Sequence, residues 1–368
     1  MADLLADSRR ADLRQDSREL ESICIKCVTW NLRLAVAAVT SLTMTHLLGF
    51  GGYVPERVMS NEDWAGLLDT SDEWITQRTG IKRRRIVADD ESTLTLAANA
   101  ARMAIKDAGL TPDDIDEIVV ATDTPEVYTP DTAALLQDLL GCRNVPTYDL
   151  GGSGCAGFVQ ALDVARARIS FTPKKVLVVG VEVITRLIDW TDRSTAVLFG
   201  DGAGAVVLGP EPGRARILDV VSGTDGSAAG ILTLGAGGTR NPFNRRTLES
   251  GEYNRLVMDG RRVFTEAVHR MSEAVEEVLQ RIGRTVGEVA LVIPHQANLR
   301  IIEAVRKRLG VDAERVYVNV HEYGNIGSAT VPFAMWEGVE TGRIEEGDLV
   351  VLTAFGAGFH WAAAAIQF

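Results

Sequence analysis

The stretch Asp149–Phe158, D-L-G-G-S-G-C-A-G-F, is the part of the sequence from which the rest can be interpreted. An apolar run at 145–150 precedes it and a helical pattern at 156–169 follows it, which predicts a strand, a tight glycine turn and a helix start. Cys155 would then lie at the positive end of a helix dipole, which favours the thiolate. Its small neighbours would let a substrate carbonyl approach the sulfur. The pattern indicates a nucleophile that forms a covalent intermediate, and a buried structural cysteine is the alternative.

Composition limits the classes of function. The chain has 368 residues, of which 46% are hydrophobic, enough for two domains or one large duplicated unit. Its net charge of −12 argues against a nucleic-acid binder. Four cysteines in this length do not indicate a disulfide framework, so we expect a reducing, cytoplasmic location. Cys24-x-x-Cys27 has no second pair, and no metal-ligand spacing occurs elsewhere in the sequence, so no metal site is expected.

Residues 1–43 differ from the remainder of the chain. Acidic and basic residues alternate near the start, and the apolar run at 34–44 is too short to span a bilayer, so no membrane association is expected. We expect an extension that is non-core or disordered, with the folded domain starting near Met44. A fraying amphipathic helix is the alternative.

From Met44 onward, predicted strands and helices alternate. Near-continuous apolar strands between helices predict sheets covered on both faces. The segments 117–120 and 176–179 resemble 288–291 and 349–352 at nearly equal offsets, which indicates an internal duplication. We place the two halves at 44–212 and 213–368. In the second half we predict a strand at 316–320, and a last buried strand at 348–353.

Two polar residues are candidate partners of Cys155. His295 directly follows a predicted strand, and Asn325 lies in a loop of small residues after another. Strand ends are where α/β proteins place catalytic groups. A structural loop histidine and a turn asparagine are the alternatives. The turn F-G-A-G-F at 355–359 could hold an oxyanion on its backbone N–H groups, or be a simple turn.

Basic residues cluster twice in this acidic chain. Arg78 and the run 82–85 flank Trp74, and Arg300 and the run 306–308 follow His295 on one predicted helix. Solvated faces are the ordinary explanation. Beside a catalytic loop, such a patch indicates an anionic partner. The glycine run at 200–204 leads into a strand rather than a helix, which argues against a dinucleotide site.

Taken together, these stretches resemble β-ketoacyl-acyl-carrier-protein synthase III, the condensing enzyme that starts fatty-acid synthesis. The resemblance covers Met44 to Phe368. The matching motifs are T-S-D-E-W-I-T-Q-R-T-G-I at 70–81, G-C-A-G-F at 154–158, F-G-D-G-A-G-A at 199–205, P-H-Q-A-N-L-R-I at 294–301, Y-G-N at 323–325 and the final F-G-A-G-F. The resemblance implies a thiolase-like fold, with two duplicated α/β halves in a five-layer α-β-α-β-α arrangement. It also implies a homodimer with acyl-CoA and malonyl-acyl-carrier protein as substrates and no separate cofactor.

The resemblance also implies roles for individual residues. Cys155 would be the acylated nucleophile, and His295 and Asn325 would stabilise the enolate formed as CO2 leaves. Main-chain N–H groups of Cys155 and Ala357 would form an oxyanion hole. The further expected contacts are Trp74, Arg78, Arg193 and Asn298 for coenzyme A, and Gln296, Arg300, Lys307 and Arg308 for the carrier protein.

The chain departs from the family pattern at a few positions. Ile326-Gly327 follows Asn325 where Thr-Ser is common. Thr129 lies where straight-chain enzymes often carry a phenylalanine that closes the acyl pocket across the dimer, so we expect that the primer is not limited to acetyl and can be longer or branched. A related priming ketosynthase or acyltransferase of a polyketide pathway is the nearest alternative. A non-catalytic acyl-CoA-binding protein is a more distant one, disfavoured by the cysteine.

Overall fold

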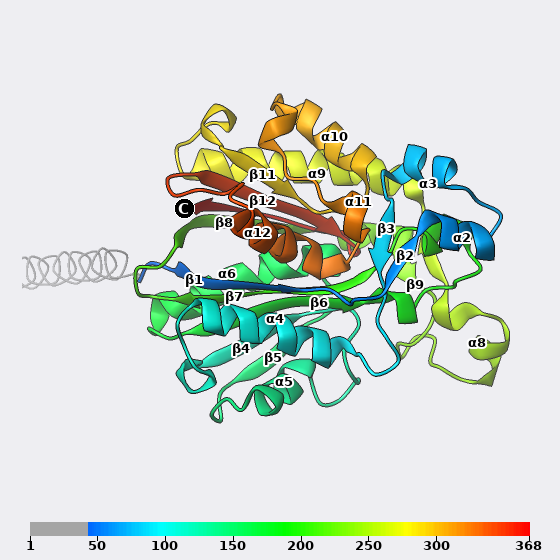
Figure 1. The fold of residues 1–368 in the computed structure, drawn as a ribbon, viewed down its shortest axis with the longest axis horizontal. Coiled ribbons are helices and arrows are strands. Elements are labelled where there is room, and N and C mark those ends of the chain that lie inside the picture. Colours follow the sequence, from blue (N-terminus) through cyan, green and yellow to red (C-terminus); the bar gives the residue numbers. More distant parts are fainter. Residues whose placement is uncertain (1–42) are drawn as a thin grey trace, which may run out of the picture. The chain divides into compact units, whose positions relative to one another are not determined.

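Segments rich in valine, alanine and glycine form nine strands of one sheet in the computed structural model, which describes residues 43–368 (Figure 1). β1 (His46–Tyr53) and β8 (Ala215–Thr224) join its two parts through only two residue pairs, near the first residues of both strands. One part has the order β1, β7, β6, β4, β5 and the other β8, β13, β12, β11. The other strands are β4 (Glu117–Ala121), β5 (Thr147–Leu150), β6 (Val176–Val183), β7 (Asp201–Gly209), β11 (Leu291–Pro294), β12 (Leu349–Gly356) and β13 (His360–Gln367).

Helices complete five layers. The first outer layer contains α4 (Thr93–Asp107) and α5 (Thr132–Leu140), and its apolar residues pack on β4, β6 and β7. The middle layer contains α6 (Gly157–Phe171) and α12 (Thr330–Glu340), between the two parts of the sheet. The second outer layer contains α9 (Gly260–Arg281) and α10 (Leu299–Leu309) over β11, β12 and β13. The expected α-β-α-β-α arrangement is therefore confirmed (Figure 1).

Smaller elements surround these layers. They are β2 (Val58–Ser60), α2 (Asn61–Leu67), α3 (Asp72–Thr79), β3 (Arg83–Arg85), α7 (Arg193–Ala196), β9 (Leu232–Leu234), α8 (Arg245–Glu249), β10 (Leu256–Met258) and α11 (Val320–Tyr323). No helix among residues 43–368 is both long and apolar enough to cross a membrane.

The two halves repeat the same strand pattern. β4 is parallel to β6, which is antiparallel to β7, and β11 is parallel to β12, which is antiparallel to β13. The segment that starts at Val316 corresponds to β5, because it makes one parallel bridge to Val292 of β11. We propose 212/213 as the boundary between the halves, since it falls in the connection from β7 to β8.

Two sequence predictions need correction, and two strands were missed. The segment 316–320 is not a strand: after its single bridge the chain turns into α11. The strand predicted at 348–353 runs on to Gly356 and is not the last, because β13 follows it. The alanines at 362–365 of β13 carry little β propensity, so the sequence pattern missed this strand. β8 was also missed. The predictions for residues 1–43, including Cys24-x-x-Cys27, fall outside the described residues, apart from Thr43.

Candidate active site

A glycine turn places Cys155 between β5 and α6. Residues Gly154–Ala156 form one turn of 3-10 helix before α6 begins at Gly157. Gly154 has φ +54°, and a side-chain carbon there would overlap the amide nitrogen of Ala357. A side-chain carbon at Gly356 would overlap the amide nitrogen of Cys155. Glycine at both positions lets the two turns pack backbone to backbone, as the predicted oxyanion hole requires.

The pKa of the Cys155 thiol is raised, whereas the sequence led us to expect a lowered one. Burial raises the pKa of Cys155, and the carboxyls of Glu182 and Asp123 raise it further, whereas the Asn325 amide lowers it. Desolvation therefore outweighs the helix dipole that the sequence indicated. The resting protein carries the neutral thiol at pH 7.

His295 is a neutral imidazole that lines the same cavity as Cys155. It directly follows β11, its backbone N–H donates to Thr353 O at 2.8 Å, and its side chain is 4% exposed. Its Nδ1 lies 2.6 Å from Thr330 Oγ1 at the start of α12. Burial lowers its pKa to about 3. A neutral ring whose Nδ1 accepts from Thr330 presents Nε2–H as a donor.

The side chain of Asn325 is oriented by the backbone two residues further along the chain. Its Oδ1 accepts the N–H of Gly327 at 2.9 Å, which leaves the amide Nδ2 as the donor toward Cys155. Its main chain bridges to Phe199, in the F-G-D-G-A-G-A motif. The loop before β7 thus fixes the position of the asparagine.

These groups line one cavity of about 1250 Å3. Cys155, His295, Asn325 and Ala357 are among its lining residues, and so are Asn298 and Arg300. Much of the remaining wall is apolar, with Leu187, Ile188, Leu198, Leu232, Leu234, Leu256 and Met258. A nucleophile, two neutral donors and backbone amides thus share a space large enough for an extended thioester. Among the described residues, no cluster of His, Cys, Asp and Glu could hold a metal ion.

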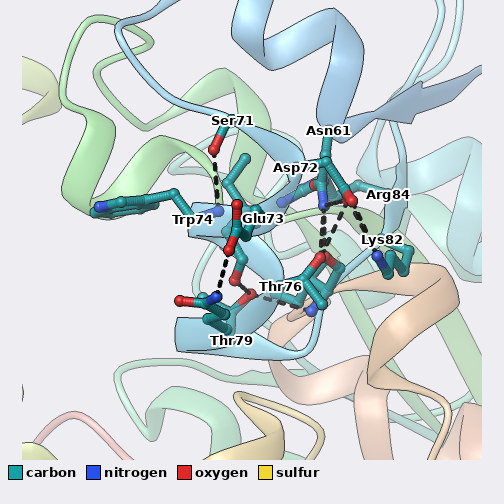
Figure 2. A network of polar contacts seen from close by, with 12 residues as sticks. Asn61, Ser71, Asp72, Glu73, Trp74, Thr76, Thr79, Lys82 and Arg84 are labelled. Carbon is teal, nitrogen blue, oxygen red and sulfur yellow. Dashed lines mark hydrogen bonds and ion pairs between the residues drawn. The ribbon is translucent and has the colours of Figure 1, made fainter.

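A polar network positions the expected coenzyme A residues (Figure 2). Ser71 caps α3, and Asp72 accepts from Asn61 Nδ2 at 2.8 Å. Arg84 is fully buried and donates to Asn61 Oδ1 at 2.5 Å and to the Val197 carbonyl. Burial lowers the pKa of Arg84 to about 9, so the side chain stays charged at pH 7. This network anchors the helix that carries Trp74.

Trp74 is contacted by two guanidinium groups. The Cζ atoms of Arg78 and Arg193 lie 4.4 Å and 4.8 Å from the centroid of its ring. Arg193 also donates to the carbonyl of Asp69 at 2.5 Å. An aromatic ring stacked on Trp74 would replace one of these cation–π contacts.

The residues expected to bind the carrier protein divide into two groups. Gln296 is 1% exposed, and its amide contacts four backbone groups, of Pro294, Tyr317, Asn319 and Val320, so its side chain is not a surface contact. Arg300, Lys307 and Arg308 on α10 are exposed. None of these three forms an ion pair within residues 43–368. They leave basic side chains at both ends of α10, of which Arg300 lines the cavity.

Asn298 has a structural role at the start of α10. Its Oδ1 accepts the N–H of Arg300 at 2.8 Å, and its Nδ2 donates to the carbonyl of Arg78 at 3.1 Å. It therefore ties α10 to α3. Thr129 is exposed and does not line the cavity, although its neighbours Val127 and Tyr128 do.

Sequence reasoning missed three buried polar residues at the site: Glu182, Ser328 and Thr330. A lone glutamate in the apolar strand Val176–Val183 was a readable signal for the first. Ser328 and Thr330 had no comparable signal, because their partners lie far away in the sequence.

Comparison with known proteins identifies the family. Two family models match the chain: 3-oxoacyl-[acyl-carrier-protein] synthase III over residues 148–226, and its C-terminal part over 279–368. A β-ketoacyl-[acyl-carrier-protein] synthase III of Oleidesulfovibrio alaskensis is 44% identical over 329 residues, covering 88% of this chain and 99% of that protein. The chain belongs to the β-ketoacyl-[acyl-carrier-protein] synthase III family. The expected acyltransferase class and thiolase-like fold are thereby confirmed.

Solved structures agree with this family. The β-ketoacyl-[acyl-carrier-protein] synthase III of Thermus thermophilus is 45% identical with a TM-score of 0.81, covering 88% of this chain and 98% of that one. The priming β-ketosynthase of the R1128 polyketide pathway is 38% identical with a TM-score of 0.81, covering 89% and 97%. The β-ketoacyl synthase III fold therefore occurs among these relatives in a polyketide pathway as well.

Proposed function

We propose that this enzyme condenses an acyl-CoA primer with malonyl-acyl-carrier protein, giving β-ketoacyl-acyl-carrier protein, coenzyme A and CO2. The supporting observation is the convergence of Cys155, His295, Asn325 and the Gly356–Ala357 turn on one cavity. Each group has the chemical form that its role needs: a thiol nucleophile, neutral donors and backbone amides.

The first half-reaction is acyl transfer to Cys155. The sulfur attacks the thioester carbonyl, a tetrahedral oxyanion forms, and the coenzyme A sulfur leaves with the proton that the thiol gives up. The amides of Cys155 and Ala357 would stabilise that oxyanion, and the close packing of their two turns supports this. Because the pKa of the thiol is raised, its proton must leave during the attack rather than before it.

The second half-reaction uses His295 and Asn325 as donors. Loss of CO2 from the malonyl group leaves an enolate, whose oxygen accepts their N–H groups. The enolate carbon attacks the acyl-Cys155 carbonyl, and the C–S bond breaks to release the β-keto product and free the cysteine. The low pKa of His295 keeps the ring neutral, as a hydrogen-bond donor to the enolate should be. Loss of CO2 forms the enolate directly, so no base has to remove a proton from carbon.

We propose that acyl-CoA and the carrier protein approach from one side. Trp74, Arg78 and Arg193 would bind the nucleotide end of coenzyme A, and Asn298 would line the path to Cys155. Arg300, Lys307 and Arg308 would bind an acidic carrier protein. The enzyme would act as a cytoplasmic homodimer, with Thr129 near the acyl pocket of the partner subunit.

The test is intact-protein mass after mixing with a panel of acyl-CoAs, followed by malonyl-acyl-carrier protein. We expect an acyl adduct on the wild type and none on Cys155→Ala, and discharge of the adduct with release of CO2. An adduct that malonyl-acyl-carrier protein cannot discharge would instead support a plain acyltransferase. No adduct with any acyl-CoA would overturn the proposal.

The same panel tests the primer and the pathway. The apolar cavity wall supports acceptance of isobutyryl or longer primers as well as acetyl, and Thr129 would contribute only from the partner subunit. Loading by acetyl-CoA alone would contradict this. The relative from a polyketide pathway keeps that pathway as a second candidate. Discharge by a polyketide carrier protein in preference to a fatty-acid one would favour it.

A further inference from the structure

Two carboxyls, the buried Glu182 and the half-buried Asp123, lie against the Cys155 turn and have no part in the chemistry above. Glu182, on β6, is 1% exposed, and the backbone N–H of Asp123 donates to its two oxygens at 3.1 Å and 3.3 Å. Neither acid has an ion-pair partner within residues 43–368. A buried carboxyl pair without a cation holds at most one full negative charge readily.

Burial raises the pKa of both acids, but their hydrogen bonds differ. Asp123 Oδ1 accepts the N–H of Gly152 at 2.7 Å, which favours the ionised form. Glu182 Oε2 lies 2.7 Å from Thr124 Oγ1, which itself accepts the N–H of Val183 at 2.9 Å. The hydroxyl proton of Thr124 therefore points at Oε2, and that oxygen is an acceptor.

The other oxygen faces Ser328. Ser328 Oγ lies 2.9 Å from Glu182 Oε1 and 3.1 Å from the carbonyl oxygen of Gly154. A serine hydroxyl has one proton, and the Gly154 carbonyl can only accept. With an ionised Glu182 the single hydroxyl proton of Ser328 would be shared between the two acceptors, whereas a proton on Oε1 donated to Ser328 leaves the hydroxyl proton wholly for the Gly154 carbonyl. Burial and Asp123 together raise the pKa of Glu182 to about 8, in agreement with this arrangement.

We propose that Glu182 is a positioning residue held as a neutral carboxylic acid, which donates to Ser328 so that Ser328 can donate to the Gly154 carbonyl. This chain joins the turn that carries Cys155 to the turn that follows Asn325. Gly327 is required for it, because a side-chain carbon there would overlap Cγ of Glu182. The proposal rests on the proposed role of Cys155 and adds a residue that sets its position.

Other ionisable groups near Glu182 do not replace this chain. Asp201 on β7, which pairs with Val183, accepts from Thr185 and from the N–H of Val87, and burial raises its pKa to about 6. His360 on β13 interacts with Asp123 rather than with Glu182. The thiol of Cys155 faces both acids. Ionisation of Glu182 would remove the donor to Ser328 and add a second negative charge beside the sulfur.

The test compares Glu182→Gln with the wild type across pH. The glutamine amide reproduces the neutral acid, with N–H to Ser328 and its oxygen to Thr124, so turnover at pH 7 should stay within about threefold of the wild type. One unit above a pKa of about 8 only about a tenth of the glutamates stay protonated, so the ratio of variant to wild-type turnover should rise about tenfold by pH 9. Ser328→Ala should lower turnover and abolish this difference.

A second readout does not depend on condensation. The rate of Cys155 alkylation by iodoacetamide, followed on its own peptide by mass, reports the pKa of the thiol. Glu182→Gln should lower that pKa, because the charge of Glu182 is absent. The proposal is overturned if Glu182→Gln is as impaired at pH 7 as Glu182→Leu, or if both pH profiles match those of the wild type. Failure of acyl loading in the wild type would instead overturn the proposed function, and the alkylation result would stand.

Discussion

Burial fixes the charge of His295, and its cost should be visible in stability. The pKa of this imidazole is about 3 in the folded protein and about 6.5 in an unfolded chain. Below pH 6.5 this imidazole therefore binds a proton in the unfolded chain but not in the folded protein. This term lowers the free energy of unfolding as pH falls from 6.5 toward 3.

We expect His295→Gln to remove this dependence. Between pH 7 and pH 5 the wild type should lose about 2 kcal/mol more stability than the variant, measured as the free energy of unfolding in urea. The contribution of the acidic residues to the pH dependence cancels in this comparison, because they titrate in both proteins. Equal losses in the two proteins would show that His295 is already protonated at pH 5, against its assignment as a neutral donor.

The elements around the site are joined by backbone contacts that tolerate no side chain. At the end of β12, Gly356 packs on the amide of Cys155. We expect Gly356→Ala to displace one or both amides and to slow acylation of Cys155 by about 100-fold or more, the usual effect of losing an oxyanion donor. The rate of adduct formation by mass measures it.

The matched control is Gly226→Ala. Gly226 lies in an exposed turn where an added carbon meets nothing within 4 Å. This variant should acylate at the wild-type rate and melt at a similar temperature. Normal acylation in Gly356→Ala would mean that the two amides do not form the oxyanion hole.

At the scale of the whole molecule, we expect the basic residues at the end of α10 to affect the binding of the carrier protein and not that of acyl-CoA. Lys307 and Arg308 are exposed at the end of α10 and do not line the cavity. We expect Lys307→Glu/Arg308→Glu to raise the KM for malonyl-acyl-carrier protein about tenfold or more and to weaken its salt dependence, while acyl-CoA loading is unchanged. Steady-state kinetics at two salt concentrations tests this.

The control reverses two charges in the opposite outer layer. Arg102 and Lys106 are exposed on α4. Arg102→Glu/Lys106→Glu makes the same change in net charge and should leave the KM unchanged. If both double variants weaken carrier binding equally, the effect is one of net charge, and α10 is not the contact surface.

Contacts between residues that lie far apart in the sequence could not be predicted from local patterns. The turn at Cys155 and the strand before His295 are local patterns, so they could be predicted. The contact from Ser328 to Glu182 spans 146 positions, and Gly327, which stands where serine is common in the family, gains meaning only beside Glu182. β13 was missed for a different reason: its alanines are chosen for close packing between helices and sheet, and not for strand propensity.

The duplicated architecture has a consequence for origins. Cys155 comes from the first half of the chain, whereas His295, Asn325 and Ala357 come from the second. If the halves arose by duplication, an ancestor with the length of one half would have carried only part of the site on one subunit. It would have needed a second copy of itself to bring a nucleophile and hydrogen-bond donors together. Fusion of two such copies would remove that dependence on concentration and free each to change separately. One copy could then keep the thiol while the other acquired the imidazole and the amide.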